Sequence, residues 1–346
     1  MKTNHKPAIL LIYTGGTIGM IKDFETGALK AFNFDQLLER IPELHLLDCT
    51  IDTFSFDEPI DSSDMNPQHW ITMAEVIEKN HDAFDGFVVL HGSDTMSYSA
   101  SALSFMLENL KKPVILTGSQ LPIGDLRTDA KENLITAIQV ASLWESNEPV
   151  IKEVCLYFEY KLYRGNRTTK ISAEHFNAFT SPNLPHLAES GVHLKINDRL
   201  LDVFYTNESF RIHKKMSANV MILKLFPGIS KHVLEAILKI ENLQGIVLET
   251  YGSGNAPTEW WFISLLQKAI ANGLQVVNVT QCSGGSVNMG QYETSTALKE
   301  IGVLSGKDIT TEAAITKLMY LLGKQISPLE FKKHFETPIC GEMEIN

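Results

Sequence analysis

Ala8-Ile-Leu-Leu-Ile-Tyr13, followed directly by Thr14-Gly-Gly-Thr-Ile-Gly19, is the stretch from which the fold can first be inferred. Six apolar residues in a row predict a buried strand, because alternation is absent and the run is short for a helix. The paired glycines allow a tight turn that can approach a ligand closely. On this stretch alone, a ligand-binding turn and an ordinary strand-to-loop turn with local threonine hydrogen bonds fit equally well.

Strands alternate with helices along the rest of the chain. Buried strands are predicted at 87–90, 113–117, 154–158, 220–225, 245–248 and 276–279, and helices at 34–41, from 67, at 131–143, from 230, at 260–271 and at 311–322. A further helix after residues 91–95 carries Leu103, Met106, Leu107 and Leu110 as a core-facing stripe, and the segment 22–30 is predicted as a loop. This alternation predicts α/β architecture with βαβ units. We expect a larger N-terminal domain (1–190) with a mixed, mainly parallel sheet flanked by helices, a linker (191–218), and a smaller C-terminal α/β domain (219–346) with a parallel sheet.

Composition narrows the classes of partner. The 346 residues carry a net charge of −11. Binding to a phosphate backbone needs positive charge, so we expect no nucleic-acid partner. No apolar run approaches the ~20 residues that span a bilayer, so we expect no membrane partner. Only six apolar residues precede the first glycines, which is short for a signal peptide, and a cytoplasmic location is predicted. The four dispersed cysteines argue against structural zinc and a disulfide framework.

Polar side chains, most of them with hydroxyl groups, follow three of the predicted N-terminal strands. Thr17 follows the first, Ser93, Asp94 and Thr95 follow the second, and Ser119 follows the third. The carboxyl ends of parallel strands line one crevice, so these side chains are expected to cluster there. Their convergence is stronger support for a functional site than any one turn.

Missing motifs restrict the chemistry. The chain has no H-E-x-x-H, G-x-S-x-G or G-x-G-x-x-G signature and no Walker lysine, which argues against those zinc-hydrolase, α/β-hydrolase and nucleotide sites. A hydroxyl nucleophile remains, and it needs a base. The stretch Arg164-Gly-Asn-Arg-Thr-Thr-Lys170 could supply a lysine base, although charge alone favours a solvated positive loop.

Three motifs together resemble bacterial-type L-asparaginases, most closely the cytoplasmic type I branch. These are Tyr13-Thr-Gly-Gly-Thr-Ile-Gly19, His91-Gly-Ser-Asp-Thr-Met96 and the stretch 164–170. Further similarity at 61–65, 178–183, 251–257, 281–282 and 287–290 extends the resemblance over nearly the whole chain. It implies hydrolysis of L-asparagine to L-aspartate and ammonia through an acyl-enzyme, without metal or cofactor.

The resemblance also implies a role for each motif residue. Thr17 would be the nucleophile, and Thr14 would be structural. Ser93, Asp94 and Lys170 would form a second hydroxyl–carboxylate–amine group, in which neutral Lys170 relays a proton from Ser93. The Asp94 carboxylate would also hold the substrate α-ammonium.

Substrate binding is assigned by the same resemblance. Ser62 would bind the α-carboxylate, with Ser63 beside it, and backbone N–H groups around Gly92 and Ser93 would stabilise the oxyanion. Ser119 would lie near the leaving amide. Asn255 would come from the neighbouring subunit of a homodimer or homotetramer. Helix capping by Ser62 and Asp94 is the structural alternative.

Two departures from the family pattern affect the site. Ser93 stands where the family usually has threonine, which keeps the hydroxyl and loses a methyl group. Ala28 stands near the place of a loop tyrosine that helps to activate the nucleophile. Either Glu25 or Lys30 substitutes for that tyrosine, or activity is reduced, or the substrate differs.

The alternatives are a related glutaminase or amidotransferase-subunit amidohydrolase and a non-catalytic amino-acid-binding protein. A nucleotide-binding enzyme is the weakest of the candidates. Asp61, Asp64 and His91 are interpreted as structural residues.

Overall fold

The computed structural model describes residues 6–22, 29–31, 41–201, 208–290 and 293–345. The chain forms two compact units, Met1–Lys214 and Lys215–Asn346, and each is described by itself. The predicted helix at 34–41 and the loop position Ala28 lie outside the described residues.

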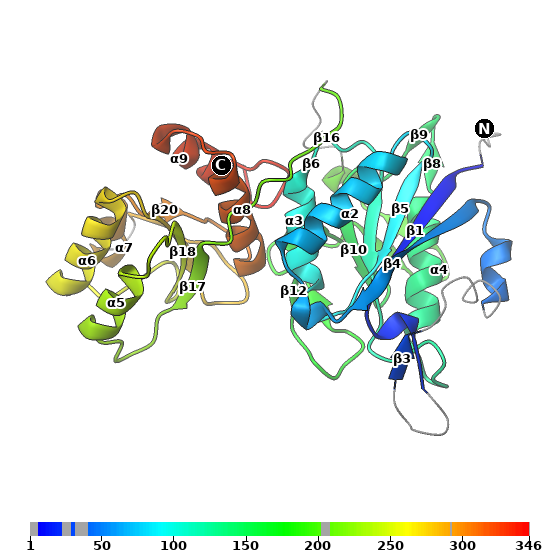
Figure 1. The fold of residues 1–346 in the computed structure, drawn as a ribbon, viewed down its shortest axis with the longest axis horizontal. Helices are drawn as coiled ribbons and strands as arrows, with labels where there is room; N and C mark the ends of the chain where they lie inside the picture. Colours follow the sequence, from blue (N-terminus) through cyan, green and yellow to red (C-terminus); the bar gives the residue numbers. More distant parts are fainter. Residues whose placement is uncertain (1–5, 23–28, 32–40, 202–207, 291–292, 346) are drawn as a thin grey trace. The chain divides into compact units, whose positions relative to one another are not determined.

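A mixed sheet, eight-stranded within the described residues, forms the centre of the first unit (Figure 1). Its parallel strands are, in spatial order, β10 (Val154–Phe158), β7 (Val114–Thr117), β5 (Gly86–Leu90), β1 (Ala8–Gly15) and β4 (Thr50–Ile60). Beyond β10 the sheet continues with the antiparallel strands β11 (Lys161–Arg164), β14 (Ala188–Ser190) and β15 (Leu194–Ile196). The mixed, mainly parallel sheet predicted from the sequence is confirmed.

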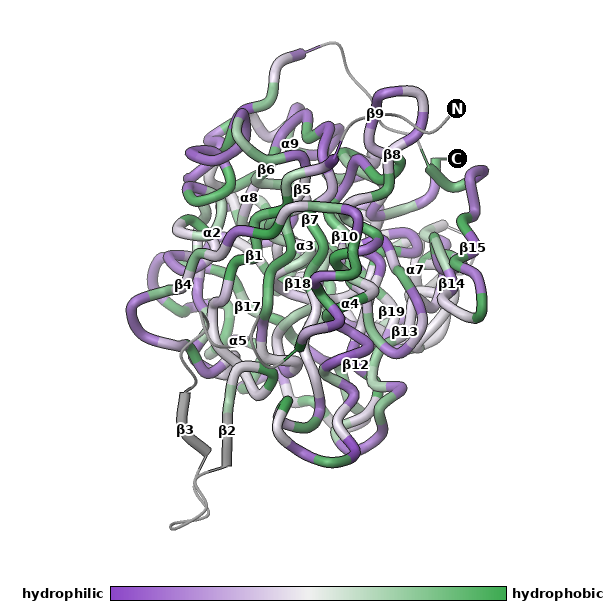
Figure 2. The backbone as a smooth tube through the Cα atoms, turned by 90° about the vertical axis from the view of Figure 1, so that its right-hand side faces the viewer, coloured by the Kyte–Doolittle hydropathy of each residue, from purple (hydrophilic) through white to green (hydrophobic). Residues whose placement is uncertain are grey.

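Helices cover both faces of this sheet, which explains the unbroken apolar run of β1. Ile9, Leu11 and Tyr13 belong to the same buried core as apolar residues of α4 (Ala130–Ala141). The helices α2 (Pro67–Asn80) and α3 (Met96–Met106) lie on the opposite face (Figure 1). A strand buried on both faces shows no alternation of apolar and polar residues, and Figure 2 shows β1, β5 and β7 as mainly hydrophobic.

The helix α3 is shorter than the apolar stripe in its sequence. Leu103 and Met106 lie on it, but Leu107 begins the strand β6 (Leu107–Glu108), and Asn109 has a φ of 60°. A left-handed residue of this kind turns the chain out of the helix. Leu107 is nevertheless buried, so the prediction that it faces the core is confirmed, but the prediction that it lies in the helix is wrong.

Residues 191–218, predicted as a linker, contain strands that pair within the first unit. The strand β15 continues the main sheet, and β16 (Arg211–Ile212) pairs with β6. The Arg211 Nε lies 2.5 Å from the Glu108 carboxylate across that pair. These strands belong to the first unit, and the division between the units, at Lys214, falls inside the range predicted as a linker. Short edge strands explain the polar composition of this segment.

The second unit contains a parallel sheet in the order β17 (Val220–Lys224), β18 (Gly245–Thr250), β19 (Gln275–Thr280) and β20 (Leu304–Ser305). Its helices are α5 (Lys231–Leu238), α6 (Trp260–Ala271), α7 (Glu293–Glu300), α8 (Thr311–Gly323) and α9 (Pro328–Glu336). The predicted smaller C-terminal α/β domain is confirmed. The helix α9, which begins with a Ser327 capping box, was not predicted.

The segment after the first turn contains regular structure at both of its described ends. The strands β2 (Met20–Lys22) and β3 (Leu29–Ala31) pair antiparallel, with Met20 opposite Ala31. The sequence suggested a loop from Lys22 to Lys30, and the ends of that loop are strands instead.

Candidate active site

Three glycines bring three segments of the first unit into close backbone contact. A Cβ atom on Gly15 would lie 2.2 Å from the Ile60 carbonyl oxygen, and one on Gly16 would lie 2.5 Å from the Gly92 nitrogen. A Cβ atom on Gly92 would lie 2.5 Å from the Ser62 Oγ. Because no side chain fits at these distances, the ends of β1, β4 and β5 can meet only through glycine.

The two threonines of the first turn have different environments. The Thr14 Oγ1 donates a hydrogen bond of 2.9 Å to the carbonyl of Leu90 and is buried. Thr17 begins a short 3-10 helix, Thr17–Gly19, and is partly exposed. The Tyr13 hydroxyl donates to the Gly19 carbonyl at 3.2 Å and so holds the end of this turn. Burial raises the pKa of Tyr13 to about 12. Tyr13 therefore supports the turn as a neutral phenol.

Lys170 joins the residues of the second motif. Its Nζ lies 2.8 Å from the Ser93 Oγ and 2.6 Å from the Asp94 Oδ1. The Lys170 side chain is 17% exposed, whereas that of Asp94 is 67% exposed. The three residues predicted as a hydroxyl–carboxylate–amine group are therefore in direct contact, and one carboxylate oxygen faces solvent.

The segment that carries Lys170 is anchored in the unit and is not a solvated positive loop. Arg164 is buried and lies 2.5 Å from the Glu153 carboxylate, and Arg167 is also buried. The Thr168 hydroxyl donates to the Gly165 carbonyl at 2.8 Å, and its oxygen lies 3.1 Å from the Ser97 Oγ, three residues beyond Asp94. These contacts hold Lys170 beside α3 and correct the interpretation that charge alone favoured.

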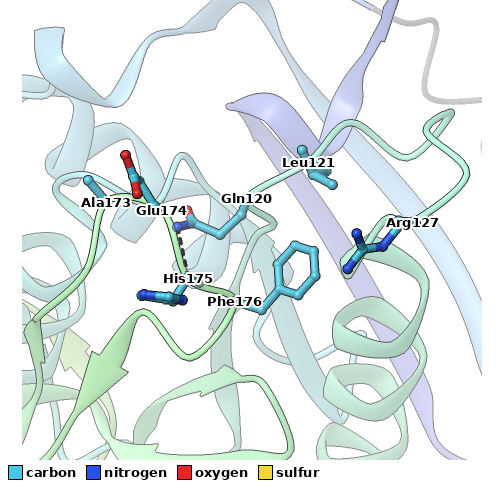
Figure 3. A pocket seen from close by; sticks show the side chains of 7 residues that line it. All are labelled: Gln120, Leu121, Arg127, Ala173, Glu174, His175 and Phe176. Atoms are coloured by element: carbon cyan, nitrogen blue, oxygen red, sulfur yellow. Dashed lines mark hydrogen bonds between the residues drawn. The ribbon is translucent and has the colours of Figure 1, made fainter.

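Gln120 belongs to this group although it was not singled out from the sequence. The Ser93 hydroxyl donates to its Oε1 at 3.1 Å. Its Nε2 donates to the His175 carbonyl at 3.1 Å, a hydrogen bond drawn in Figure 3. Its position directly after Ser119 at a strand end was the available signal. Gln120 also lines a depression of about 550 Å³ with Leu121, Arg127, Ala173, Glu174, His175 and Phe176.

The two serines after β4 differ in exposure. Ser62 is buried against Gly92, and its carbonyl accepts a bond of 2.6 Å from the Thr95 hydroxyl. Ser63 is exposed, and its hydroxyl donates to Asp61, whose side chain caps the short helix Ser62–Asp64. Asp61, and not Ser62, therefore caps the short helix that follows β4. The other residue considered as a helix cap, Asp94, pairs with Lys170 instead.

Two other predicted residues have hydrogen bonds within their own turns. Ser119 is buried and donates to the Leu121 carbonyl at 2.6 Å, within its own turn. Asn255 belongs to the second unit, where its backbone pairs with Tyr251. The Asn278 side chain donates to the Gly254 carbonyl of the same turn at 3.0 Å.

Within the described ranges, no group of three or more His, Cys, Asp or Glu side chains is placed to hold a metal ion. No helix in the described part of the chain is long and apolar enough to cross a membrane.

The whole chain is similar to known proteins of one family. Residues 8–201 match the asparaginase N-terminal domain, and residues 219–335 match the glutaminase/asparaginase C-terminal domain. The chain therefore belongs to the asparaginase family.

Individual relatives agree with this assignment. L-asparaginase 1 of Escherichia coli K12 is 43% identical over 98% of both chains. The L-asparaginase I structure from Vibrio cholerae is 40% identical, with a TM-score of 0.90, and the match covers 99% of this chain and all of that one. The mouse 60 kDa lysophospholipase is 40% identical over 97% of this chain and 62% of its own length.

Proposed function

We propose that the protein hydrolyses the side-chain amide of L-asparagine, giving L-aspartate and ammonia through a threonine acyl-enzyme. The observation that carries the proposal is the contact between Gly16 and Gly92, which brings the Thr17 turn beside the group formed by Ser93, Asp94 and Lys170. A nucleophilic hydroxyl next to an amine and a carboxylate is an arrangement suited to acyl transfer.

Acylation begins when the Thr17 Oγ1 forms a bond to the amide carbon. The hydroxyl proton passes to the leaving nitrogen, the C–N bond breaks, and ammonia departs. Water then adds to the ester carbon, and cleavage of its bond to Thr17 releases aspartate. In both steps the N–H groups of Gly92 and Ser93 stabilise the oxyanion, at ~3–4 kcal/mol per donor in other hydrolases.

The second group moves protons and holds the substrate. In the structure the Lys170 Nζ donates to the Ser93 Oγ, and the Ser93 hydroxyl donates to Gln120. For the relay, Lys170 first gives up a proton and the Ser93 hydroxyl turns to it, so that the neutral amine accepts the proton of Ser93. The exposed Asp94 oxygen receives the α-ammonium, and Ser62, with Ser63 beside it, receives the α-carboxylate. Ser119 lies near the leaving amide in this arrangement.

We also propose that the site is completed in a homodimer or homotetramer, with Asn255 contributed by the neighbouring subunit. No cofactor is required. A cytoplasmic location stays a prediction of the sequence.

A test compares ammonia release from asparagine and glutamine, with aspartate as the control, in wild-type protein and in Thr17→Ala. We expect release from asparagine that disappears in the variant. Full turnover by Thr17→Ala would contradict the nucleophile assignment. Faster release from glutamine would favour a glutaminase, and binding of asparagine without ammonia would favour a non-catalytic binding protein.

The departure at Ala28 has its own test, although positions 23–28 and the side chain of Lys30 lie outside the described residues. If Glu25 or Lys30 takes over the part of the missing tyrosine, Glu25→Ala or Lys30→Ala slows acylation. Unchanged acylation rates in both variants would show that neither residue replaces it.

A further inference from the structure

His91 connects two buried helices to the backbone of the second motif. It is completely buried at the end of β5, and its Nδ1 lies 2.6 Å from the Gly92 carbonyl oxygen. Its Nε2 lies 2.8 Å from the Ser99 Oγ of α3, and the Trp70 Nε1 of α2 donates to that same oxygen at 2.9 Å. Four residues thus form one continuous chain of hydrogen bonds, from Trp70 through Ser99 and His91 to Gly92.

The direction of this chain follows from the chemistry of its two ends. An indole N–H can only donate, so the Ser99 oxygen accepts from Trp70; because the neutral ring carries its one proton on the Nδ1, the Ser99 hydrogen goes to the His91 Nε2. A carbonyl oxygen can only accept, so the His91 Nδ1 carries the ring proton. Burial, which lowers the pKa of His91 to about 4, keeps the ring neutral and is consistent with this tautomer.

The Gly92 carbonyl is part of the same peptide as the Ser93 N–H. In a trans peptide these two groups point in opposite directions, so fixing the oxygen also fixes the direction of the N–H. Among the residues that the structure describes, neither the Gly92 N–H nor the Ser93 N–H donates to a protein acceptor. The peptide is therefore held by its oxygen while its donor remains available.

The backbone of His91 is fixed independently of its ring. Its N–H donates to the Thr117 carbonyl at 2.9 Å, and a Cβ atom on Gly118 would lie 2.3 Å from the His91 carbonyl oxygen. The ring therefore contacts Gly92 from a fixed backbone position, and a fixed support of this kind is needed to preorganise an oxyanion donor.

We propose that His91 is a positioning residue, which holds the Gly92–Ser93 peptide so that the Ser93 N–H faces the developing oxyanion. This inference rests on the proposed amide hydrolysis and assigns His91 a part in it. The Gly92 carbonyl requires the tautomer in which the Nδ1 donates, Ser99 stabilises that tautomer by donating to the Nε2, and the imidazole transfers no proton.

Two isosteric substitutions separate the contacts of the ring. The Asn amide nitrogen is as many bonds from Cβ as the histidine Nδ1, so His91→Asn can keep the bond to Gly92 and lose the one to Ser99. The Gln amide nitrogen matches the Nε2 in the same way, so His91→Gln keeps the bond to Ser99 alone. We expect kcat to fall about 10- to 100-fold in His91→Gln, less than the ~10²–10³-fold measured for deleting an oxyanion donor elsewhere. His91→Asn should retain most of the activity.

The helix α3 supplies a matched control pair. Ser99 and Ser101 are both completely buried, but Ser101 donates to the Ser97 carbonyl within the helix, away from His91. Ser99→Ala should lower kcat several-fold because the ring can then adopt the other tautomer. Ser101→Ala should leave kcat at the wild-type value.

The measurements are kcat and KM for ammonia release, the affinity for L-aspartate by calorimetry, and chemical denaturation to confirm folding. The positioning role predicts a loss in kcat with unchanged KM and aspartate affinity, and rescue by Asn but not by Gln. Folded His91→Gln with wild-type kcat, or equal losses in Gln and Asn variants, would overturn it. Wild-type protein that releases no ammonia from any amide would instead overturn the proposed function.

Discussion

Two lysine–carboxylate pairs of this protein have similar geometry and different surroundings. Lys170 lies 2.6 Å from Asp94 in the first unit, and Lys317 lies 2.5 Å from Glu342 in the second. The first pair is 17% and 67% exposed, whereas both partners of the second are 0% exposed. Distance alone therefore does not distinguish a structural pair from one that can take part in a reaction.

The buried pair uses all of its hydrogen-bonding capacity on the protein. The three ammonium hydrogens of Lys317 serve Glu342 and the carbonyls of Phe335 and Thr337, both at 2.8 Å. The Glu342 carboxylate also accepts the backbone N–H groups of Ile339 and Cys340. Burial raises the pKa of Glu342, but Lys317 and these N–H groups outweigh it and hold that pKa below its usual range. This pair fixes the C-terminal segment against α8.

The Lys170 pair leaves capacity unused. One hydrogen bond of Lys170 goes to the Ser93 hydroxyl, which can itself exchange a proton, and the Asp94 carboxylate is exposed to solvent. A buried ion pair whose hydrogen-bond donors and acceptors are all used within the protein cannot bind a ligand. A pair with unused donors or acceptors can.

The largest expected effect comes from removing Lys170. Lys170→Met should lower kcat for ammonia release by about 10²–10⁴-fold, the usual contribution of a positioned acid or base. Its free energy of unfolding should stay within about 1 kcal/mol of wild type, because its partner is exposed. Lys112→Met, which removes a half-buried lysine that donates to the His81 and Phe84 carbonyls, is the control with wild-type kcat. Wild-type turnover by Lys170→Met would break the comparison.

Removing Lys317 should have the opposite signature. Lys317→Met leaves the Glu342 charge buried without its partner, which costs about 3–5 kcal/mol in comparable cases. Urea denaturation should show this loss, while kcat per folded molecule should be unchanged. A stability equal to that of wild type would mean that the Lys317 pair does not hold the C-terminal segment.

The buried ring of His91 predicts a pH dependence of stability. The unfolded state binds the proton near pH 6.5, but the folded state does so only near pH 4. The His91 contribution to stability should therefore fall as the pH drops from 6.5 to 4, by on the order of 3 kcal/mol, and stay constant below that range. His91→Asn should lose this part of the slope in urea denaturation between pH 7 and 4. His232→Asn, at an exposed position, should keep the wild-type slope, and equal slopes in wild type and His91→Asn would refute the argument.

The sequence predicted the sheet, most of the helices and the convergence of strand ends, because these depend on local patterns. The continuous apolar run of β1 and the glycine turns are such patterns. The two threonines of the first turn could not be separated in this way, because the bond from Thr14 to the Leu90 carbonyl and the difference in burial depend on tertiary contacts.

Other features depend on residues that are distant in the chain. Lys170 lay in a stretch that charge alone assigned to solvent, and the burial of Arg164 against Glu153 requires tertiary contact. Lys317 lies on an apolar helix and meets Glu342 only because the chain returns after α9. The His91 chain likewise extends to Trp70, which lies on another helix.

The smallest expected effect sharpens the comparison, because it changes one carboxylate in each pair to its amide. Asp94→Asn should alter the free energy of unfolding by less than about 1 kcal/mol, as exposed pairs contribute little. Glu342→Gln should cost more, because a buried amide cannot neutralise the Lys317 ammonium. The same Asp94→Asn change should raise KM for asparagine, since an amide binds the substrate α-ammonium more weakly than a carboxylate does. Urea denaturation and ammonia-release kinetics check the two halves separately. A larger stability loss for Asp94→Asn than for Glu342→Gln would show that exposure does not determine which pair is structural.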